Sequence, residues 1–151
     1  MQLHKILLSH TDSGFGGNFK NVQNYISATD EAGNHFTLFT PMAPYATSEA
    51  IRMICDEYNR AIGEGRVDPL LIIPVFIHDF LCVHPFLDGN GRVGRLIMFK
   101  ECLKYNIVPF IIEDNLKLFY YRGLKEWNNE KGYLTDTCLT TQDKYKTYLS
   151  Y

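Results

Sequence analysis

Most of the chain carries apolar residues at the three- and four-residue spacing of amphipathic helices. The first long run follows Thr47 or Ser48, either of which can cap a helix, and it stops at Gly63 or Gly65. Its inward positions are expected to be Ile51, Ile54, Cys55, Tyr58 and Ile62. The pattern predicts a long helix between these caps with one buried face.

Two further runs in the middle of the chain have helical spacing. Asp68 followed by Pro69 is typical of a helix start, and Leu70–Val83 then predicts an apolar helix. Pro74 lies within that run and predicts either a kink or the true start of the helix. The spacing of apolar residues over Arg92–Tyr105 predicts the next helix. Its apolar face is expected to comprise Leu96, Ile97, Phe99, Cys102 and Leu103.

The last third of the chain predicts an extended segment and two helices. Ile107–Ile112 is apolar around Pro109, and Asp114 or Asn115 can cap a helix that runs to about Asn129. The residues expected on one side of that helix are Leu116, Phe119, Tyr120, Leu124 and Trp127. Gly132 then predicts a break, followed by a final helix over Thr135–Tyr151. Its inward residues are expected to be Cys138, Leu139, Tyr145 and Leu149.

The N-terminal part differs in pattern from the rest. Met1–Ser9 has the spacing of a short helix, and Thr11–Asn18 is a glycine-rich loop. Val22–Ile26 and Phe36–Phe39 predict two strands, joined by a turn over Asp30–Asn34, of a hairpin that spans about residues 20–40. The expected fold is therefore all-α, a helical bundle that carries one β-hairpin, in a single domain over residues 1–151.

Composition excludes several classes of protein. Apolar residues make up 46% of the chain and charged residues 21%, with a net charge of −2, so no basic surface for nucleic acid is expected. No apolar run is long enough to span a membrane, and no signal peptide pattern is present. The four cysteines are isolated within apolar patterns, which indicates reduced thiols and a cytoplasmic protein.

The stretch from His84 to Arg95 reads HPFLDGNGRVGR and carries the candidate chemistry. Pro85 disfavours helical geometry at the residue before it, so the preceding helix should end near His84. Gly89, Gly91 and Gly94 allow tight turns at the start of the next helix. Such a glycine loop presents backbone N–H groups and the positive end of a helix dipole, and both favour phosphate.

The side chains in this stretch suit phosphate chemistry. His84 is a candidate general base, because an imidazole titrates near neutral pH. Asp88 either caps the following helix or binds Mg²⁺ together with substrate phosphates. Asn90 is either a turn residue or a phosphate contact. Arg92 and Arg95 are candidate phosphate clamps. Phe86 is expected to anchor the loop in the core.

These twelve residues resemble the signature of the Fic family (filamentation induced by cAMP), His-Pro-Phe-x-Asp/Glu-Gly-Asn-Gly-Arg-x-x-Arg, at every defined position. The resemblance implies a protein adenylyltransferase, which transfers AMP from ATP to a Ser, Thr or Tyr hydroxyl of a target protein and releases pyrophosphate. It implies His84 as the base, Asp88 as the Mg²⁺ ligand, Arg92 on the γ-phosphate and Arg95 on the phosphates of the transferred nucleotide. The nucleotide-binding residues it implies are Asp88, Gly89, Asn90, Gly91, Arg92, Val93, Gly94 and Arg95. A glycine rather than a lysine at position 91 argues against the branch of the family that phosphorylates its targets.

The resemblance extends to two weaker regions. Gly17–Lys20 and the strand after it resemble the flap of the family, whose free edge aligns the target peptide, although Lys20 stands where the family often has arginine. The flap residues expected to bind the target or cover the nucleotide are Ile26, Ser27, Ala28 and Thr29. The residues expected around the adenosine are Tyr120, Tyr121 and Asn128, which otherwise are ordinary helix residues.

Many members of the family are restrained by a helix with the pattern Ser/Thr-x-x-x-Glu-Gly/Asn, whose glutamate pairs with the arginine at the position of Arg92. Ser27–Glu31 has the first spacing, but Ala32 breaks the pattern. We therefore expect either an inhibitory partner chain or an inhibitory helix upstream in a longer parent protein. An unrestrained Arg92 predicts high basal activity.

Three alternatives remain open from the sequence. His78-Asp79 upstream of His84 and Asp88 allows an HD-type metal phosphohydrolase, although that class needs further ligands on neighbouring helices. A non-catalytic module that binds nucleotide or peptide needs neither a base nor a metal ligand. Removal of AMP from a modified protein usually needs a glutamate that places water, and the regulatory glutamate is missing.

Overall fold

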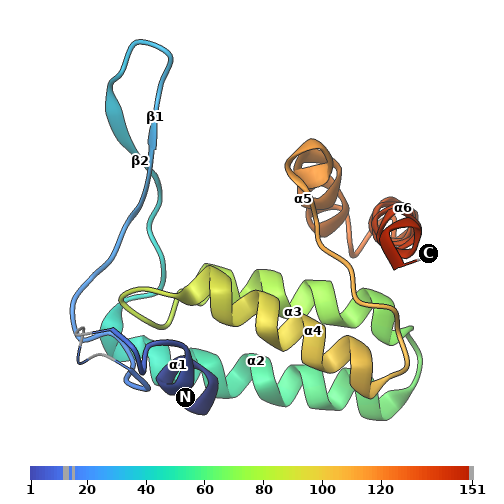
Figure 1. Ribbon diagram of the computed structural model, residues 1–151, viewed down its shortest axis with the longest axis horizontal. Coiled ribbons are helices and arrows are strands. Elements are labelled where there is room, and N and C mark those ends of the chain that lie inside the picture. Colours follow the sequence, from blue (N-terminus) through green and yellow to red (C-terminus); the bar gives the residue numbers. More distant parts are fainter. Residues whose placement is uncertain (12–13, 15, 150–151) are drawn as a thin grey trace. The chain divides into compact units, whose positions relative to one another are not determined.

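The computed structural model describes residues 1–11, 14 and 16–149, and within them the chain is mainly helical. The helices are α1 (Gln2–Leu7), α2 (Pro44–Glu64), α3 (Pro69–Val83), α4 (Asn90–Lys104), the 3₁₀ turn η1 (Asp114–Leu116), α5 (Lys117–Lys125) and α6 (Gly132–Leu149), and the strands are β1 (Ile26–Thr29) and β2 (His35–Phe39) (Figure 1). The expected all-α class with one hairpin is confirmed. No helix in the described part of the chain is both long and apolar enough to cross a bilayer.

The chain divides into two compact units. The first comprises Met1–Glu57 and His78–Gly94, and the second comprises Tyr58–Ile77 and Arg95–Tyr151. The first unit contains α1, the hairpin and the loop between α3 and α4, whereas the second contains η1, α5 and α6. All residues of the motif up to Gly94 therefore lie in the first unit.

The hairpin extends from its unit as a two-stranded ribbon (Figure 1). β1 pairs antiparallel with β2, and Ala28 lies opposite Phe36. The expected turn is confirmed, since the Asp30 carboxylate accepts hydrogen bonds from the backbone N–H groups of Ala32 at 2.9 Å and Asn34 at 2.8 Å. The expected first strand was placed too early, because residues 21–25 bond to other segments and pairing begins only at residue 26.

The start of α3 follows its predicted cap. The Asp68 carboxylate accepts from the N–H of Leu70 at 2.8 Å, and Pro69 occupies the first helical position. The helix continues through Pro74 to Val83, so residue 74 is not its start. In contrast, α2 begins at Pro44, before the expected caps, and the Thr47 hydroxyl donates back to the carbonyl of Ala43 at 3.0 Å.

The buried face of α4 differs from the expected one. Three residues assigned to that face are substantially exposed, namely Leu96, Phe99 and Leu103. The buried positions are Asn90, Val93, Gly94, Met98, Glu101 and Cys102. Glu101 is buried, and its carboxylate accepts from the Tyr58 hydroxyl at 2.8 Å and from the Lys100 ammonium at 2.6 Å. A count of apolar residues misses a face that includes glycine, asparagine and glutamate.

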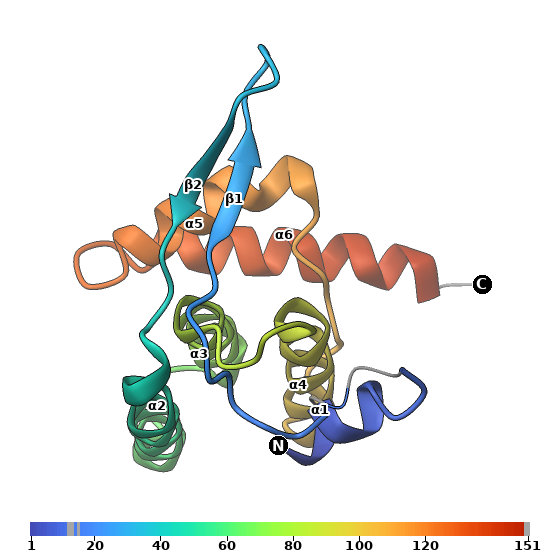
Figure 2. The same ribbon diagram turned by 90° about the vertical axis from the view of Figure 1, so that its left-hand side faces the viewer.

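In the second unit α5 and α6 lie side by side (Figure 2). Gly123 of α5 lies against the backbone of Leu134, so close that a Cβ atom there would come within 2.7 Å of the Leu134 Cα. The expected helix to about Asn129 is shorter, because a 3₁₀ turn precedes it and α5 ends at Lys125. The last helix begins at Gly132 rather than Thr135, and the expected residues 150–151 lie outside the described residues.

Several expected inward positions of the C-terminal helices are exposed. Phe119, Leu139 and Leu149 are between 41% and 59% exposed, whereas Leu134 and Cys138 are fully buried. All four cysteines are free thiols, as expected, and two of them are only half-buried.

Candidate active site

The motif loop begins where α3 ends, at His84. The His84 N–H still donates to the carbonyl of Phe80 at 2.9 Å, but its φ of +50° lies in the left-handed region. Pro85 has no N–H to donate and disfavours helical geometry at the residue before it. The helix therefore stops at this point, and the imidazole lies at the start of the loop.

The side chain of Asn90 holds the loop together from within. Its Oδ1 accepts from the Phe86 N–H at 2.9 Å, and its Nδ2 donates to the Phe86 carbonyl at 2.8 Å and to His84 Nδ1 at 3.1 Å. The residue is 2% exposed. The sequence left Asn90 as either a turn residue or a phosphate contact. Its side chain is turned into the loop, and its backbone lies in the first turn of α4.

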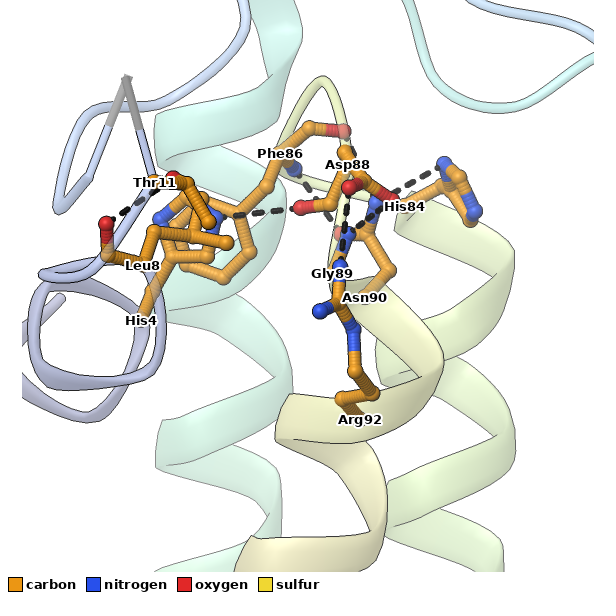
Figure 3. A network of polar contacts seen from close by, with 9 residues as sticks. All are labelled: His4, Leu8, Thr11, His84, Phe86, Asp88, Gly89, Asn90 and Arg92. Carbon is orange, nitrogen blue, oxygen red and sulfur yellow. Dashed lines mark hydrogen bonds and ion pairs between the residues drawn. The ribbon is translucent and has the colours of Figure 1, made fainter. Parts of the chain in front are cut away.

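Phe86 anchors the loop in the core, as expected, and is 2% exposed. Its ring stacks on the imidazole of His4, with 3.7 Å between centroids and 12° between planes (Figure 3). His4 Nε2 is 3.0 Å from the Asp88 carbonyl, and His4 Nδ1 accepts from the Gly17 N–H at 3.0 Å. Since a backbone N–H can only donate, Nδ1 carries the lone pair, and Nε2 donates to the carbonyl.

The sequence did not indicate that His4 supports the site. It is fully buried, and burial lowers its pKa. It supports the motif loop from a helix 84 residues earlier in the chain. No local pattern marks such a partner, because a lone histidine in a short N-terminal helix has no spacing that relates it to the loop.

A second support comes from the segment before β1. Lys20 is 3% exposed, and its ammonium group donates to the Val83 carbonyl at 3.2 Å and to Asn24 Oδ1 at 2.8 Å. Asn24 Nδ2 in turn donates to the Phe86 carbonyl at 3.0 Å and to His84 Nδ1 at 2.9 Å. None of these four hydrogen bonds was predicted. These hydrogen bonds connect the segment before β1 to the loop that carries the candidate base.

The environment of His84 favours the neutral form of its imidazole. Burial lowers the pKa of His84 below its usual value, and the positive charge of Lys20 acts in the same direction, while Asp88 opposes them. The lowered pKa favours the unprotonated ring, the form that a general base requires.

The start of α4 presents the charged groups of the site. Gly89 has φ of +80°, which favours glycine, and its N–H donates to the Asp88 carboxylate at 2.6 Å. The Arg92 guanidinium donates to the other oxygen of Asp88 at 2.8 Å (Figure 3). Arg92 is 45% and Asp88 76% exposed, so both side chains are accessible to a ligand. The Val93 N–H donates to the Gly89 carbonyl at 2.9 Å, and the geometry of a helix start leaves the earlier N–H groups of the first turn, those of Asn90, Gly91 and Arg92, for an anion.

The donor set suits Mg²⁺ that is bound mainly through phosphate. Asp88 provides one exposed carboxylate beside a helix N-terminus. Mg²⁺ commonly takes one or two carboxylates together with substrate phosphates. Within the described residues, no group of three His, Cys, Asp or Glu side chains could hold a metal on its own, and an HD-type phosphohydrolase would need such a group.

The remaining predicted residues lie elsewhere on the fold. Arg95 is exposed on α4, and the two residues that precede it in the chain, Val93 and Gly94, are buried. In the second unit, Tyr120 is 8% exposed and its hydroxyl donates to the Pro74 carbonyl at 2.6 Å.

The structure also describes the other residues that were predicted to bind adenosine or the target. Tyr121 is 54% exposed, and Asn128 is exposed. The flap residues Ile26–Thr29 form β1, alternately half-buried and exposed.

The family model for the Fic/DOC family matches residues 1–102, about two thirds of the chain. The chain therefore belongs to the Fic/DOC family, as its motif indicated.

The chain is similar to curated proteins from animals. It is 26% identical over 124 residues to "Protein adenylyltransferase fic-1" of Caenorhabditis elegans, which covers 82% of this chain and 22% of that protein. It is 28% identical over 125 residues to "Protein adenylyltransferase Fic" of Drosophila willistoni, which covers 83% of this chain and 23% of that protein. The chain thus spans less than a quarter of the length of these relatives.

Two solved structures share the fold. A Fic domain containing signaling protein from Bacteroides thetaiotaomicron aligns with a TM-score of 0.67 at 19% identity, over 95% of this chain and 58% of that one. Fic-1 from C. elegans aligns with a TM-score of 0.62 at 21% identity, over 97% of this chain and 41% of that one.

Proposed function

We propose that this chain is a protein adenylyltransferase that transfers AMP from ATP to a hydroxyl side chain of a target protein. The observation that carries the proposal is the arrangement of one loop. An imidazole that favours its neutral form, at the end of α3, is followed within eight residues by the N-terminus of α4, with Asp88 and Arg92 exposed there. Membership of the family and the names of the relatives support the same reaction class.

In the proposed reaction the target hydroxyl oxygen forms a bond to the α-phosphorus of ATP. The bond between that phosphorus and the bridging oxygen breaks, and pyrophosphate leaves. His84 takes the hydroxyl proton. The N–H groups of the first turn of α4 and the guanidinium of Arg92 stabilise negative charge on the phosphates. Arg92 must then exchange its hydrogen bond to Asp88 for one to phosphate.

The proposal includes Mg²⁺, with Asp88 as its protein ligand. The ion would neutralise part of the phosphate charge and is expected to arrive with the nucleotide. Since Asp88 also bonds to Arg92 at 2.8 Å, binding of Mg·ATP would separate two side chains that neutralise each other in this structure.

The hairpin is the proposed site for the target. β1 has only β2 as its partner in the described sheet, so its other edge can accept an extended peptide. We further propose that residues 1–151 act as one catalytic domain. A restraint on Arg92 would then come from a partner chain or from another part of a longer protein.

The test uses ATP labelled on the α-phosphate. Incubated with a whole-cell lysate and Mg²⁺, the protein is expected to transfer the label to protein, and His84→Ala should reduce the rate by about 10² to 10⁴. This loss corresponds to at least about 3 kcal/mol of barrier. Undiminished transfer by His84→Ala would contradict the role of the imidazole. His10→Ala, at an exposed histidine outside the hairpin and the motif loop, is the matched control.

A further inference from the structure

The strand ladder of the hairpin ends before the chain reaches the motif loop. Its last pair is Ile26 opposite Phe39. Two arms without strand pairing, residues 20–25 and residues 40–43, form the hairpin root. Pro41 in the second arm has no N–H and cannot continue the ladder as a donor. The arms of the hairpin root are therefore held together by something other than the ladder.

The first arm is fixed on the motif loop and on the residue before it. The Lys20 N–H donates to the Pro85 carbonyl at 2.8 Å, and the Lys20 ammonium donates to the Val83 carbonyl at 3.2 Å. Asn24 Nδ2 donates to the Phe86 carbonyl at 3.0 Å. Within the described residues, the second arm makes no hydrogen bond to the loop. The first arm thus carries the direct hydrogen bonds between the hairpin root and the site.

The side-chain amide of Gln23 connects the two arms. Its Nε2 donates to the Asn24 carbonyl at 2.9 Å and to the Pro41 carbonyl at 3.0 Å. Both partners can only accept, so the nitrogen of the amide and not its oxygen faces them. Gln23 is half-buried and Pro41 is buried. Among the residues that the structure describes, no other hydrogen bond joins one arm to the other.

We propose that Gln23 is a positioning residue for the proposed transfer, which joins the two arms of the hairpin root and thereby fixes the direction in which β1 leaves the motif loop. Gln23 lies outside the motif of residues 84–95 and three residues before β1. The inference rests on the proposed function for its effect on transfer, whereas its effect on the hairpin does not depend on that function.

The direction of β1 matters to the target and not to the nucleotide. A peptide that adds to the free edge of β1 follows the direction of that strand. Without the amide of Gln23 the second arm is released, and the hairpin occupies several directions. Binding of the target then has to select the productive direction, which raises the apparent dissociation constant of the target. The hydrogen bonds of Gln23 lie within the hairpin root, so the proposed phosphate contacts on α4 are unaffected.

The test of the hairpin is NMR of the whole chain. In the unaltered protein, the Gln23 amide protons should show nuclear Overhauser effects to protons of Pro41, and their absence would overturn the inference without any variant. Gln23→Met then removes both donors and keeps an unbranched side chain of similar length. The matched control is Asn21→Met, the same replacement at an exposed amide of the same arm.

The measured quantity for these variants is the ¹H–¹⁵N heteronuclear Overhauser effect of the backbone amides. It should fall over β1 and β2 in Gln23→Met, because the released hairpin moves faster and further, and it should stay unchanged over α3 and α4. Asn21→Met should resemble the unaltered protein. Unchanged values over the hairpin in Gln23→Met, or the same fall in both variants, would overturn the role of Gln23.

Kinetics provide a readout that a purely structural role would not move. The assay uses ATP labelled on the α-phosphate and a dilution series of whole-cell lysate. A hydrogen bond of ordinary net strength corresponds to about fivefold in an equilibrium constant. The lysate concentration that gives half the maximal rate should therefore rise about fivefold or more in Gln23→Met. The maximal rate and the KM for ATP should stay within about twofold.

The outcomes separate this inference from the proposed function. An unchanged half-saturating lysate concentration in Gln23→Met, an equal rise in Asn21→Met, or a KM for ATP that rises with it would overturn the positioning role. Absence of transfer by the unaltered protein would instead refute the proposed function, while the NMR measurements would still decide whether Gln23 holds the hairpin.

Discussion

The imidazole of His4 connects the N-terminal helix to the motif loop, and its replacement should weaken that loop in a measurable way. The ring bonds to the Gly17 N–H and the Asp88 carbonyl, both at 3.0 Å, and stacks on Phe86. Two variants separate these contributions. His4→Phe keeps an aromatic ring in the stack and removes both hydrogen bonds, whereas His4→Ala removes the hydrogen bonds and the stack.

The magnitudes follow from the contacts. Each hydrogen bond contributes about 1 kcal/mol net, so His4→Phe should lower the free energy of unfolding by about 2 kcal/mol. The stacked pair contributes about 1 kcal/mol beyond its buried area, so His4→Ala should cost about 3 kcal/mol or more, including the space that it leaves. His10→Ala, at an exposed histidine of the same region, should change stability by less than about 0.5 kcal/mol.

Urea unfolding followed by circular dichroism measures these differences. With a slope of about 2 kcal/mol per molar, the midpoint should fall by about 1 M for His4→Phe and further for His4→Ala. A midpoint for His4→Ala that equals that of His10→Ala would refute the conclusion that His4 supports the loop. Equal midpoints for His4→Phe and His4→Ala would refute the contribution of the stack.

Three other predictions address the rest of the fold and the site. Gly123→Ala should destabilise the protein by about 1–3 kcal/mol, because its Cβ would lie 2.7 Å from the Leu134 Cα. Gly63→Ala, in open space on α2, should instead stabilise the protein by about 0.5–1 kcal/mol. Thermal unfolding measures both changes. Burial lowers the pKa of His4, so its contribution to stability is complete above pH 6.5 and is lost as the pH falls through the lowered value. The free energy of unfolding, measured in urea, should therefore fall between about pH 7.5 and pH 5. It should fall further for the unaltered protein than for His4→Phe. Asp88→Asn should abolish the Mg²⁺ dependence of ATP binding in calorimetry, and an unchanged dependence would remove Asp88 as the metal ligand.

The sequence was sufficient where the signal is local. The cap at Asp68 and Pro69, the turn at Asp30 and the end of α3 at His84 each depend on residues adjacent in the chain. The class of fold follows from the same kind of signal, since helical spacing recurs over most of the chain and one segment alternates instead.

The sequence was insufficient where the partner is distant or polar. The buried face of α4 includes Glu101, whose carboxylate accepts from the hydroxyl of Tyr58 in another helix. His4 and Asn24 hold the motif loop through contacts between segments that lie far apart in the chain, and no periodicity marks them. The motif thus predicted the loop that carries the chemistry but not the side chains that orient it.

The most direct test of the central claim is a crystal structure of the protein with Mg²⁺ and a non-hydrolysable analogue of ATP. The account predicts phosphate oxygens against the backbone N–H groups of the first turn of α4, Mg²⁺ on Asp88, Arg92 moved from Asp88 to phosphate, and the α-phosphorus within reach of His84. A nucleotide bound elsewhere, with Arg92 still paired to Asp88, would contradict it.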